Sequence, residues 1–248
     1  MAGPVVSHDR GNVRWKLAQF ASGDHRSQFG ISGLGSISED RITTLMADAA
    51  GFDPGVVSLG GDGPVPVDPG HVLVRLEEAG DRLADAAAGG QTVLLATGHP
   101  VGLVLLYAAV GDLLVGHGAR LIRPLDGDRW RSLGRPREIR YLHGVAILTD
   151  HGSSIHTHSS EPMERMLAAA DAAGERPDLV FADHGFAGAA IEAGIDTISI
   201  ADVNDPALLV AKAQARTEHV LVFDDHVDPN AYWPVFVALT GGLREDVS

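Results

Sequence analysis

Apolar residues recur at two different periods along the chain, and the change of period divides the chain into two parts. Helical spacing runs over residues 42–49, after the capping-box motif Ser36-Ile-Ser-Glu39, and again over residues 73–87, after Asp68-Pro69. A loop rich in Gly and Pro lies between these two predicted helices, at residues 52–67. We therefore predict an N-terminal helical arm and linker over residues 1–67 and an α/β domain over residues 68–248.

From residue 91 onward the pattern becomes strand, loop and helix, repeated. Short continuous apolar runs predict buried strands at residues 92–97, 119–124, 178–182, 196–201 and 219–223. Helical patterns alternate with them at residues 101–116, 160–173, 186–193, 206–214 and 230–239. This alternation favours a three-layer, Rossmann-like α/β fold with a mostly parallel sheet, helices on both faces and the N-terminal helices as a lead-in.

The rhythm changes between residues 126 and 158. Residues 126–136 contain several arginines and predict an exposed loop, while residues 137–142 and 144–149 predict two strands. A third predicted strand follows the turn at residues 150–152 and carries His156 and His158. We expect an antiparallel hairpin inserted in the otherwise alternating domain.

Composition narrows the class of protein. The chain of 248 residues has no cysteine, which excludes disulfides, zinc–thiolate sites and cysteine nucleophiles. Its formal net charge of -14 argues against nucleic acid and against a basic membrane-binding surface. The longest apolar run, residues 101–115, is interrupted by Gly111 and Asp112 and is too short to span a bilayer, and no signal-peptide pattern is visible. We therefore expect a cytoplasmic protein.

Polar residues gather at the carboxyl ends of the predicted strands. Five successive strand ends carry His, Asp or Asn: His99, then His156 and His158, then Asp183 and His184, then Asp202, Asn204 and Asp205, and finally Asp224, Asp225 and His226. The opposite ends carry ordinary polar loops, such as residues 175–176 and 216–218. Ligands of open α/β sheets bind outside the carboxyl ends of the strands, so these side chains mark the candidate site.

His156 and His158 stand two residues apart in a predicted strand, so both imidazoles should point to the same face. Paired imidazoles chelate divalent metals, and a carboxylate completes or orients such a site. We expect His156, His158, Asp183 and Asp202 to hold a divalent ion, which is Mg, Mn or Zn. The alternative is a pair of histidines that line a polar edge without a metal. For Asp205 we expect helix capping instead.

The remaining polar residues predict acid–base and anion-binding roles. We expect proton transfer by the titratable groups His99, His184, His226 and Asp225. We expect the substrate anion to be held by small and polar residues near helix starts, namely Gly98, Gly102, Ser159, Ser160 and Asn204. Residues 98–102 match neither the P-loop nor the Gly-x-Gly-x-x-Gly pattern, so no nucleotide cofactor is expected. The alternative for these residues is a tight turn that permits close packing.

Five motifs occur in order between residues 91 and 240. They are Ala-Thr-Gly-His-Pro at 96–100, His-Thr-His-Ser at 156–159, Ala-Asp-His-Gly-Phe-Ala-Gly at 182–188, Ala-Asp-Val-Asn-Asp-Pro-Ala-Leu at 201–208 and Asp-Asp-His-Val at 224–227. Together they resemble one family of actinobacterial proteins commonly labelled "phosphatase". Phe186 stands where the family pattern has Trp, and Val203 where it has Cys. The five motifs imply homology with this family. The haloacid dehalogenase, cysteine-phosphatase and histidine-phosphatase signatures are absent, so the resemblance by itself does not establish the reaction.

These observations lead to one main hypothesis and two alternatives. The main hypothesis is a hydrolase of a small phosphorylated metabolite that uses metal-assisted phosphomonoester hydrolysis. Its partner would be a small anionic metabolite, with no nucleic acid and no membrane, and a homo-oligomer is compatible with the sequence. The alternatives are a metal-free sugar-phosphate isomerase or lyase and a non-catalytic protein that binds a small anion. Sensitivity to chelator separates the first from the second, and turnover separates both from the third.

Overall fold

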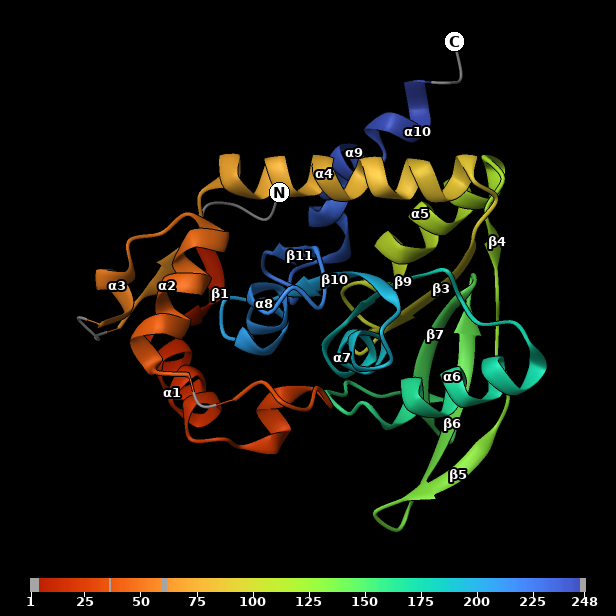
Figure 1. Ribbon diagram of the computed structural model, residues 1–248, viewed down its shortest axis with the longest axis horizontal. Helices are drawn as coiled ribbons and strands as arrows, with labels where there is room; N and C mark the ends of the chain where they lie inside the picture. Colours follow the sequence, from red (N-terminus) through yellow and green to blue (C-terminus); the bar gives the residue numbers. More distant parts are fainter. Residues whose placement is uncertain (1–4, 36, 59–61, 246–248) are drawn as a thin grey trace.

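The computed structural model describes residues 5–35, 37–58 and 62–245, and a nine-stranded sheet crosses its centre (Figure 1). Five strands run parallel to one another: β3 (Thr92–Thr97), β7 (Val145–Asp150), β9 (Leu179–Asp183), β10 (Asp196–Ala201) and β11 (His219–Val222). β4 (Arg120–Leu121) is parallel to β3, whereas β6 (Arg135–Leu142), β5 (Arg129–Ser132) and β8 (Ser153–Ser154) are antiparallel to their neighbours. The predicted mixed α/β class with a mostly parallel sheet is confirmed.

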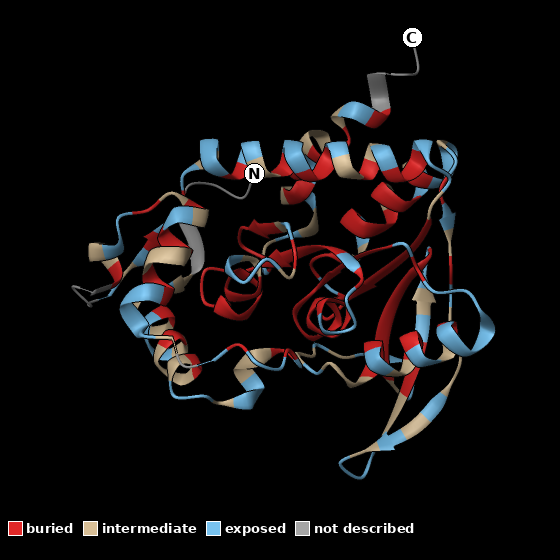
Figure 2. Ribbon diagram, in the orientation of Figure 1, coloured by how far each residue is buried: buried red, intermediate tan, exposed pale blue. Residues whose placement is uncertain are grey.

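Helices cover both faces of the sheet (Figure 1). One face carries α4 (Pro69–Ala88), α5 (Val104–Gly116) and α9 (Trp233–Leu239), and the other carries α6 (Glu161–Ala173), α7 (His184–Glu192) and α8 (Pro206–Ala213). Every residue of β3 and β9 is buried, as Figure 2 shows for the centre of the sheet. A strand covered on both faces has no polar face, which explains the continuous apolar runs. The Rossmann-like detail stays a prediction.

The order of the strands reverses beside β3. This strand pairs with β7 on one side and with β9 on the other, and the sheet continues from β9 through β10 to β11. Doubly wound sheets bind their ligands at such a reversal, outside the carboxyl ends of the strands. The loops that follow β3, β9, β10 and β11 all emerge at this edge.

The N-terminal residues pack against α8 at one side of the sheet (Figure 1). They form α1 (Arg10–Ala21), η1 (His25–Gln28), α2 (Glu39–Ala50) and α3 (Pro54–Ser58), with a two-stranded antiparallel sheet of β1 (Val5–Asp9) and β2 (Pro64–Pro66). The last described elements are η2 (Pro229–Tyr232), α9 and α10 (Gly241–Glu245), and α9 and α10 pack against α4. None of the helices described is long and apolar enough to cross a membrane. The predicted boundary after residue 67 stays a prediction.

The hairpin region differs from its prediction at residues 126–136. The sequence predicts an exposed loop there, but the structure contains β5, which pairs with β6 at the edge of the sheet. Glu161 on α6 holds this strand, because its carboxylate accepts hydrogen bonds from Trp130 Nε1 (2.7 Å) and Ser132 Oγ (2.6 Å). The loop prediction is wrong because this edge strand is short and half exposed, and it carries no apolar run.

The third hairpin strand is shorter than predicted, because β8 ends at Ser154 and residues 156–158 follow as irregular chain. The N–H of Thr157 donates to the carbonyl of Gly98 (3.0 Å) on the loop after β3. His156 and His158 therefore reach the carboxyl edge of β3 from a loop rather than from a strand.

The N-terminal part contains more regular structure than predicted. The linker expected over residues 52–67 contains α3 and β2. The helix expected after the capping box begins at Glu39, and Ser38 caps it by accepting a hydrogen bond from the N–H of Arg41 (3.3 Å). Ser36, the first residue of the predicted box, lies outside the described residues.

Candidate functional site

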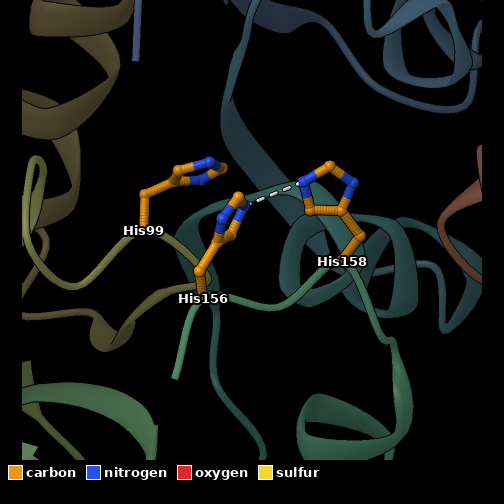
Figure 3. A group of neighbouring side chains, drawn as sticks. All are labelled: His99, His156 and His158. Atoms are coloured by element: carbon orange, nitrogen blue, oxygen red, sulfur yellow. Dashed lines mark hydrogen bonds between the residues drawn. The ribbon is translucent and has the colours of Figure 1, made fainter. Parts of the chain in front are cut away.

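Three histidines from two loops lie together at the carboxyl edge of β3 (Figure 3). His99 follows β3, whereas His156 and His158 follow β8. The Nε2 atoms of His156 and His158 are 3.0 Å apart, and the ring centroids of His99 and His156 are 4.0 Å apart. One ring nitrogen of each histidine lies within 4.8 Å of those of the other two. The structure thus brings the two predicted ligands together and adds His99 to them.

Close backbone contacts hold these loops together. Gly98 lies against the carbonyl of Thr157, where a Cβ on residue 98 would overlap the oxygen. A Cβ on Gly102 would come within 2.9 Å of the carbonyl oxygen of Asp225. A side chain at either position would therefore push the strand-end loops apart. Gly98 and Gly102 thus pack against backbone, and the predicted binding of the substrate anion by these residues stays a prediction.

Asp183, the last residue of β9, fastens the loop after β3. Its Oδ1 accepts a hydrogen bond from the N–H of Gly98 (2.6 Å), and its Oδ2 accepts one from the hydroxyl of Thr97 (2.5 Å). The N–H of His99 in turn donates to Thr97 Oγ1 (2.9 Å). Burial raises the pKa of Asp183, but the hydrogen bond and charge of His184 outweigh it and lower the pKa. Asp183 therefore positions His99, and both of its oxygens already accept hydrogen bonds.

His184 is a buried cation among carboxylates. Its Nε2 lies 2.7 Å from Asp205 Oδ2 and 3.4 Å from Asp225 Oδ2, and its Nδ1 lies 3.4 Å from Asp183 Oδ1. Burial lowers the pKa of His184, but the carboxylates outweigh burial and raise this pKa well above its usual value. The backbone φ of His184 is 44°, a left-handed conformation that is uncommon outside glycine. Such a conformation costs energy and persists only where the surrounding contacts hold it, so the ion pairs and packing around His184 fix the position of its ring.

His99, His156 and His158 are neutral near physiological pH. Burial first, and then the charge of His184, lower the pKa of His99 to about 3 and that of His158 to about 3. The same two causes lower the pKa of His156. Neutral imidazole is the form that binds metal ions. Within the described chain, the buried Nδ1 of His99 has no hydrogen-bond partner.

Three aspartates form a second group of oxygen donors. Asp202 follows β10, Asp224 and Asp225 follow β11, and one oxygen of each lies within 4.8 Å of the others. The Oδ2 atoms of Asp202 and Asp225 are buried and accept no hydrogen bond from any described residue, although His8 and His184 lie 3.3 and 3.4 Å away. Burial and neighbouring carboxylates raise the pKa of Asp202 well above its usual value, and burial raises that of Asp225 to about 7. Buried oxygens of this kind favour a nearby cation.

The N-terminal strand β1 and helix α1 also contribute to the site. His8 Nε2 lies 3.3 Å from Asp202 Oδ2, and Asn12 Oδ1 accepts a hydrogen bond from Asn204 Nδ2 (2.9 Å). Lys16 lies one helical turn further on and lines the same cavity. Sequence reasoning missed all three residues, although the spacing of four places Asn12 and Lys16 on one face of α1, and His8 lies just before this helix in β1.

These groups line one cavity of about 260 Å³. The residues that line it are all of polar or charged type and come from β1, α1 and the loops at the strand ends: His8, Asn12, Lys16, His99, His156, His158, His184, Asp202, Asn204, Asp205, Asp225 and His226. Ser159 and Ser160, which were predicted to bind the anion, do not line it. Ser159 Oγ accepts a hydrogen bond from the N–H of Glu161 (3.3 Å), and Ser160 packs against Gly30.

Asp205 is the residue that sequence reasoning placed in the wrong role. It stands at the N-cap of α8 as predicted, but its side chain makes no capping hydrogen bond and pairs with His184 instead. Burial raises the pKa of Asp205, but the charge of His184 outweighs burial and holds it at about 2. No local pattern reveals this partner, since the contact depends on the pairing of β9 with β10.

The residues present fit a divalent metal ion. Three neutral imidazoles supply nitrogen donors, and His99 contributes a buried nitrogen with no partner among the described residues. Two nitrogens that bind one tetrahedral zinc ion stand roughly 3.3 Å apart, given Zn–N bonds of about 2.0–2.1 Å. The 3.0 Å between the Nε2 atoms of His156 and His158 is close to that value.

Comparison with known proteins identifies the family. A family model described as Phosphatase matches residues 1–240. The chain belongs to this Phosphatase family. It is also 34% identical over 251 residues to Phosphatase SCO2771 of Streptomyces coelicolor (strain ATCC BAA-471 / A3(2) / M145), an alignment that covers 98% of this chain and 92% of that protein. The resemblance inferred from the five motifs is confirmed, and the Phosphatase match also includes the N-terminal residues that supply His8, Asn12 and Lys16.

Proposed function

We propose that this protein hydrolyses phosphomonoesters of a small metabolite with the help of a divalent metal ion held by His99, His156 and His158. The observation that carries the proposal is the group of three neutral imidazoles beside buried carboxylate oxygens at the reversal of the sheet. Membership of the Phosphatase family, and the name of the Streptomyces relative, favour a hydrolase over an isomerase, a lyase or a binding protein. His99 thus moves from the predicted acid–base role to a ligand, and Asp183 becomes a positioning residue.

A divalent ion at this position would polarise a phosphoryl oxygen and lower the pKa of a nearby water. Imidazole donors suit zinc or manganese better than magnesium, so we expect one of the first two. Asp202 was predicted as a ligand; it lines the same cavity, and its Oδ2 lies 3.3 Å from His8 Nε2 and accepts no hydrogen bond from a described residue, so we keep it as a candidate ligand.

The protein side chains supply the proton transfers. The Oδ2 of Asp225, which accepts no hydrogen bond from a described residue, takes the proton of the attacking water as the water oxygen bonds to phosphorus. His226 is exposed, lines the same cavity and gives a proton to the ester oxygen as the bond from phosphorus to that oxygen breaks. His184 keeps its charge beside these carboxylates and fixes their positions.

Elemental analysis of the purified protein, combined with phosphate release from 4-nitrophenyl phosphate, tests the proposal. We expect about one metal ion per chain and metal-dependent release, and both should be lost in the double variant His156→Ala/His158→Ala. His151→Ala is the matched control, because this exposed histidine precedes the same loop and lies outside the cavity. Wild-type protein that binds neither zinc nor manganese after soaking, or that releases no phosphate when loaded, would refute the proposal.

A further inference from the structure

The cavity of about 260 Å³ that contains His99, His156 and His158 is called the metal-ligand cavity below. A second cavity of about 240 Å³ adjoins it on the side of the N-terminal helices. We call it the arm pocket. Trp15, Lys16 and Gln19 on α1 and Arg26 on η1 form its outer wall. Its inner wall includes His158 and Asp205, which also line the cavity of about 260 Å³. A molecule whose phosphate lies at the histidines can therefore extend into the arm pocket.

The cations of the arm pocket differ in their partners. Arg26 is committed to Asp24, whose carboxylate accepts hydrogen bonds from Arg26 Nε (3.1 Å) and Nη2 (2.8 Å). Lys16 has no carboxylate within 4.0 Å in the described ranges 5–35, 37–58 and 62–245, and its Nζ lies 5.5 Å from the centroid of the Trp15 ring. Lys16 is also the one lysine or arginine among the residues that line the metal-ligand cavity, and the other cation there, His184, is paired with Asp205 and Asp225. Its charge is thus available to a ligand.

We propose that the arm pocket binds the alcohol part of the phosphomonoester and that Lys16 binds a second negatively charged group on that part. This inference rests on the proposed function and names its substrate class, which is phosphorylated molecules that carry a further carboxylate or phosphate. The electrostatic reason is direct: the neighbouring wall contains the carboxylates of Asp202, Asp205 and Asp225. Three carboxylates face one paired cation, His184, so a second anion on the ligand needs a further cation. Lys16 stands where the two cavities meet and offers an ammonium group to that anion.

Calorimetric titration of zinc-loaded protein with three non-hydrolysable phosphonates tests this inference without turnover. Methylphosphonate carries no second anionic group. 3-Phosphonopropionate carries a carboxylate as its second anionic group, and propane-1,3-diphosphonate carries a second phosphonate. We expect at least one of the two probes with a second anionic group to bind about tenfold tighter than methylphosphonate. The tighter of the two identifies the second group as carboxylate or phosphate.

Variants of α1 assign the preference to Lys16. Lys16→Met should reduce the ratio of affinities to about one, and Lys16→Arg should retain part of it. Arg14→Met is the matched control, because it removes the same charge from an exposed position of α1 outside both cavities and should keep the ratio. Metal content measured on each variant shows that the ion is still bound.

Equal affinities of the three probes for the wild type, or an unchanged ratio in Lys16→Met, would overturn the inference alone. Absence of zinc-dependent binding of all three probes would count against the proposed function, and the inference would fall with it.

Discussion

The Nε2 atom of His184 lies 2.7 Å from Oδ2 of Asp205, and both side chains are buried. A buried ion pair gains little over an apolar pair, but loss of one partner leaves the other charge uncompensated. This pair joins the end of β9 to the start of α8. Because His184 also contacts Asp225, the pair forms part of the floor of the candidate site.

Asp205→Asn should therefore destabilise the protein on the order of 3 kcal/mol, since the amide leaves His184 with a weaker partner. Urea denaturation followed by circular dichroism measures this loss. Asp196→Asn is the matched control: it breaks an ion pair with Arg82 (2.6 Å) whose carboxylate is 42% exposed, so it should cost only about 0–1 kcal/mol. Equal losses in the two variants would contradict the structural role given to Asp205.

Metal binding should raise the melting temperature of the wild type. Zinc at about one hundred times its Kd stabilises the native state by about 2.7 kcal/mol, which corresponds to roughly 5–10 °C for a chain of this length. The shift should be absent in His156→Ala/His158→Ala and small with magnesium, because imidazole donors disfavour that ion. Differential scanning calorimetry measures it, and a larger shift with magnesium than with zinc would argue for carboxylate ligands instead.

Gly98→Ala should weaken metal binding at least about tenfold, because the new Cβ would overlap the carbonyl of Thr157 and displace the segment that carries the histidines. Isothermal titration with zinc measures the affinity. Gly116→Ala is the control: no atom lies within 4 Å of a Cβ there, and alanine in α5 should leave stability unchanged or raise it slightly. Unaltered zinc affinity in Gly98→Ala would show that the loop contact does not position the ligands.

Glu192 gives a pH-dependent contribution to stability. Its carboxylate accepts hydrogen bonds from the hydroxyl of Ser32 (2.5 Å), from the N–H of Ser32 (2.9 Å) and from Arg216 Nη2 (2.5 Å). The hydrogen bond from the Ser32 hydroxyl is the largest cause that lowers the pKa of Glu192. A pKa that is lower in the folded state stabilises the fold above the unfolded value near 4.5 and ceases to do so as pH falls through the folded value.

Glu192→Gln should therefore cost a few tenths to about 1 kcal/mol at neutral pH, and less below about pH 4, because the site is partly exposed. Urea denaturation at several pH values measures the difference. Ser32→Ala removes one donor, so the effect of Glu192→Gln should shrink in that background. A cost of Glu192→Gln that grows as the pH falls would reverse the predicted sign.

The parts of the fold that sequence predicts well are those in which local pattern and burial agree. β3 and β10 have the predicted bounds, and β9 is shifted by one residue at each end, because both faces of these strands are covered and nearly every position is buried. The rule that ligands bind at carboxyl strand ends also brought together most of the residues that line the cavity, from His99 to His226.

The parts that sequence does not predict depend on contacts between distant segments. Asn12 and Asn204 are 192 positions apart, and nothing in α1 itself shows that this helix lies beside the loop after β10. Asp205 fits a helix cap by every local criterion, yet the charge of His184 determines its role. Tertiary contacts override local preference at these positions.

The hydrogen bond between Asn12 and Asn204 also constrains how the site forms during synthesis. During synthesis Asn12 leaves the ribosome early, and Asn204 leaves it only after most of the chain has emerged. Until then α1 cannot make its contact with the loop after β10. Closing a loop of this length is among the slower steps of folding, since its entropic cost precedes the contacts that offset it. The loops that carry His99, His156 and His158 leave the ribosome before Asn204 does, so the side of the cavity that depends on the contact between Asn12 and Asn204 is completed after these loops have been made.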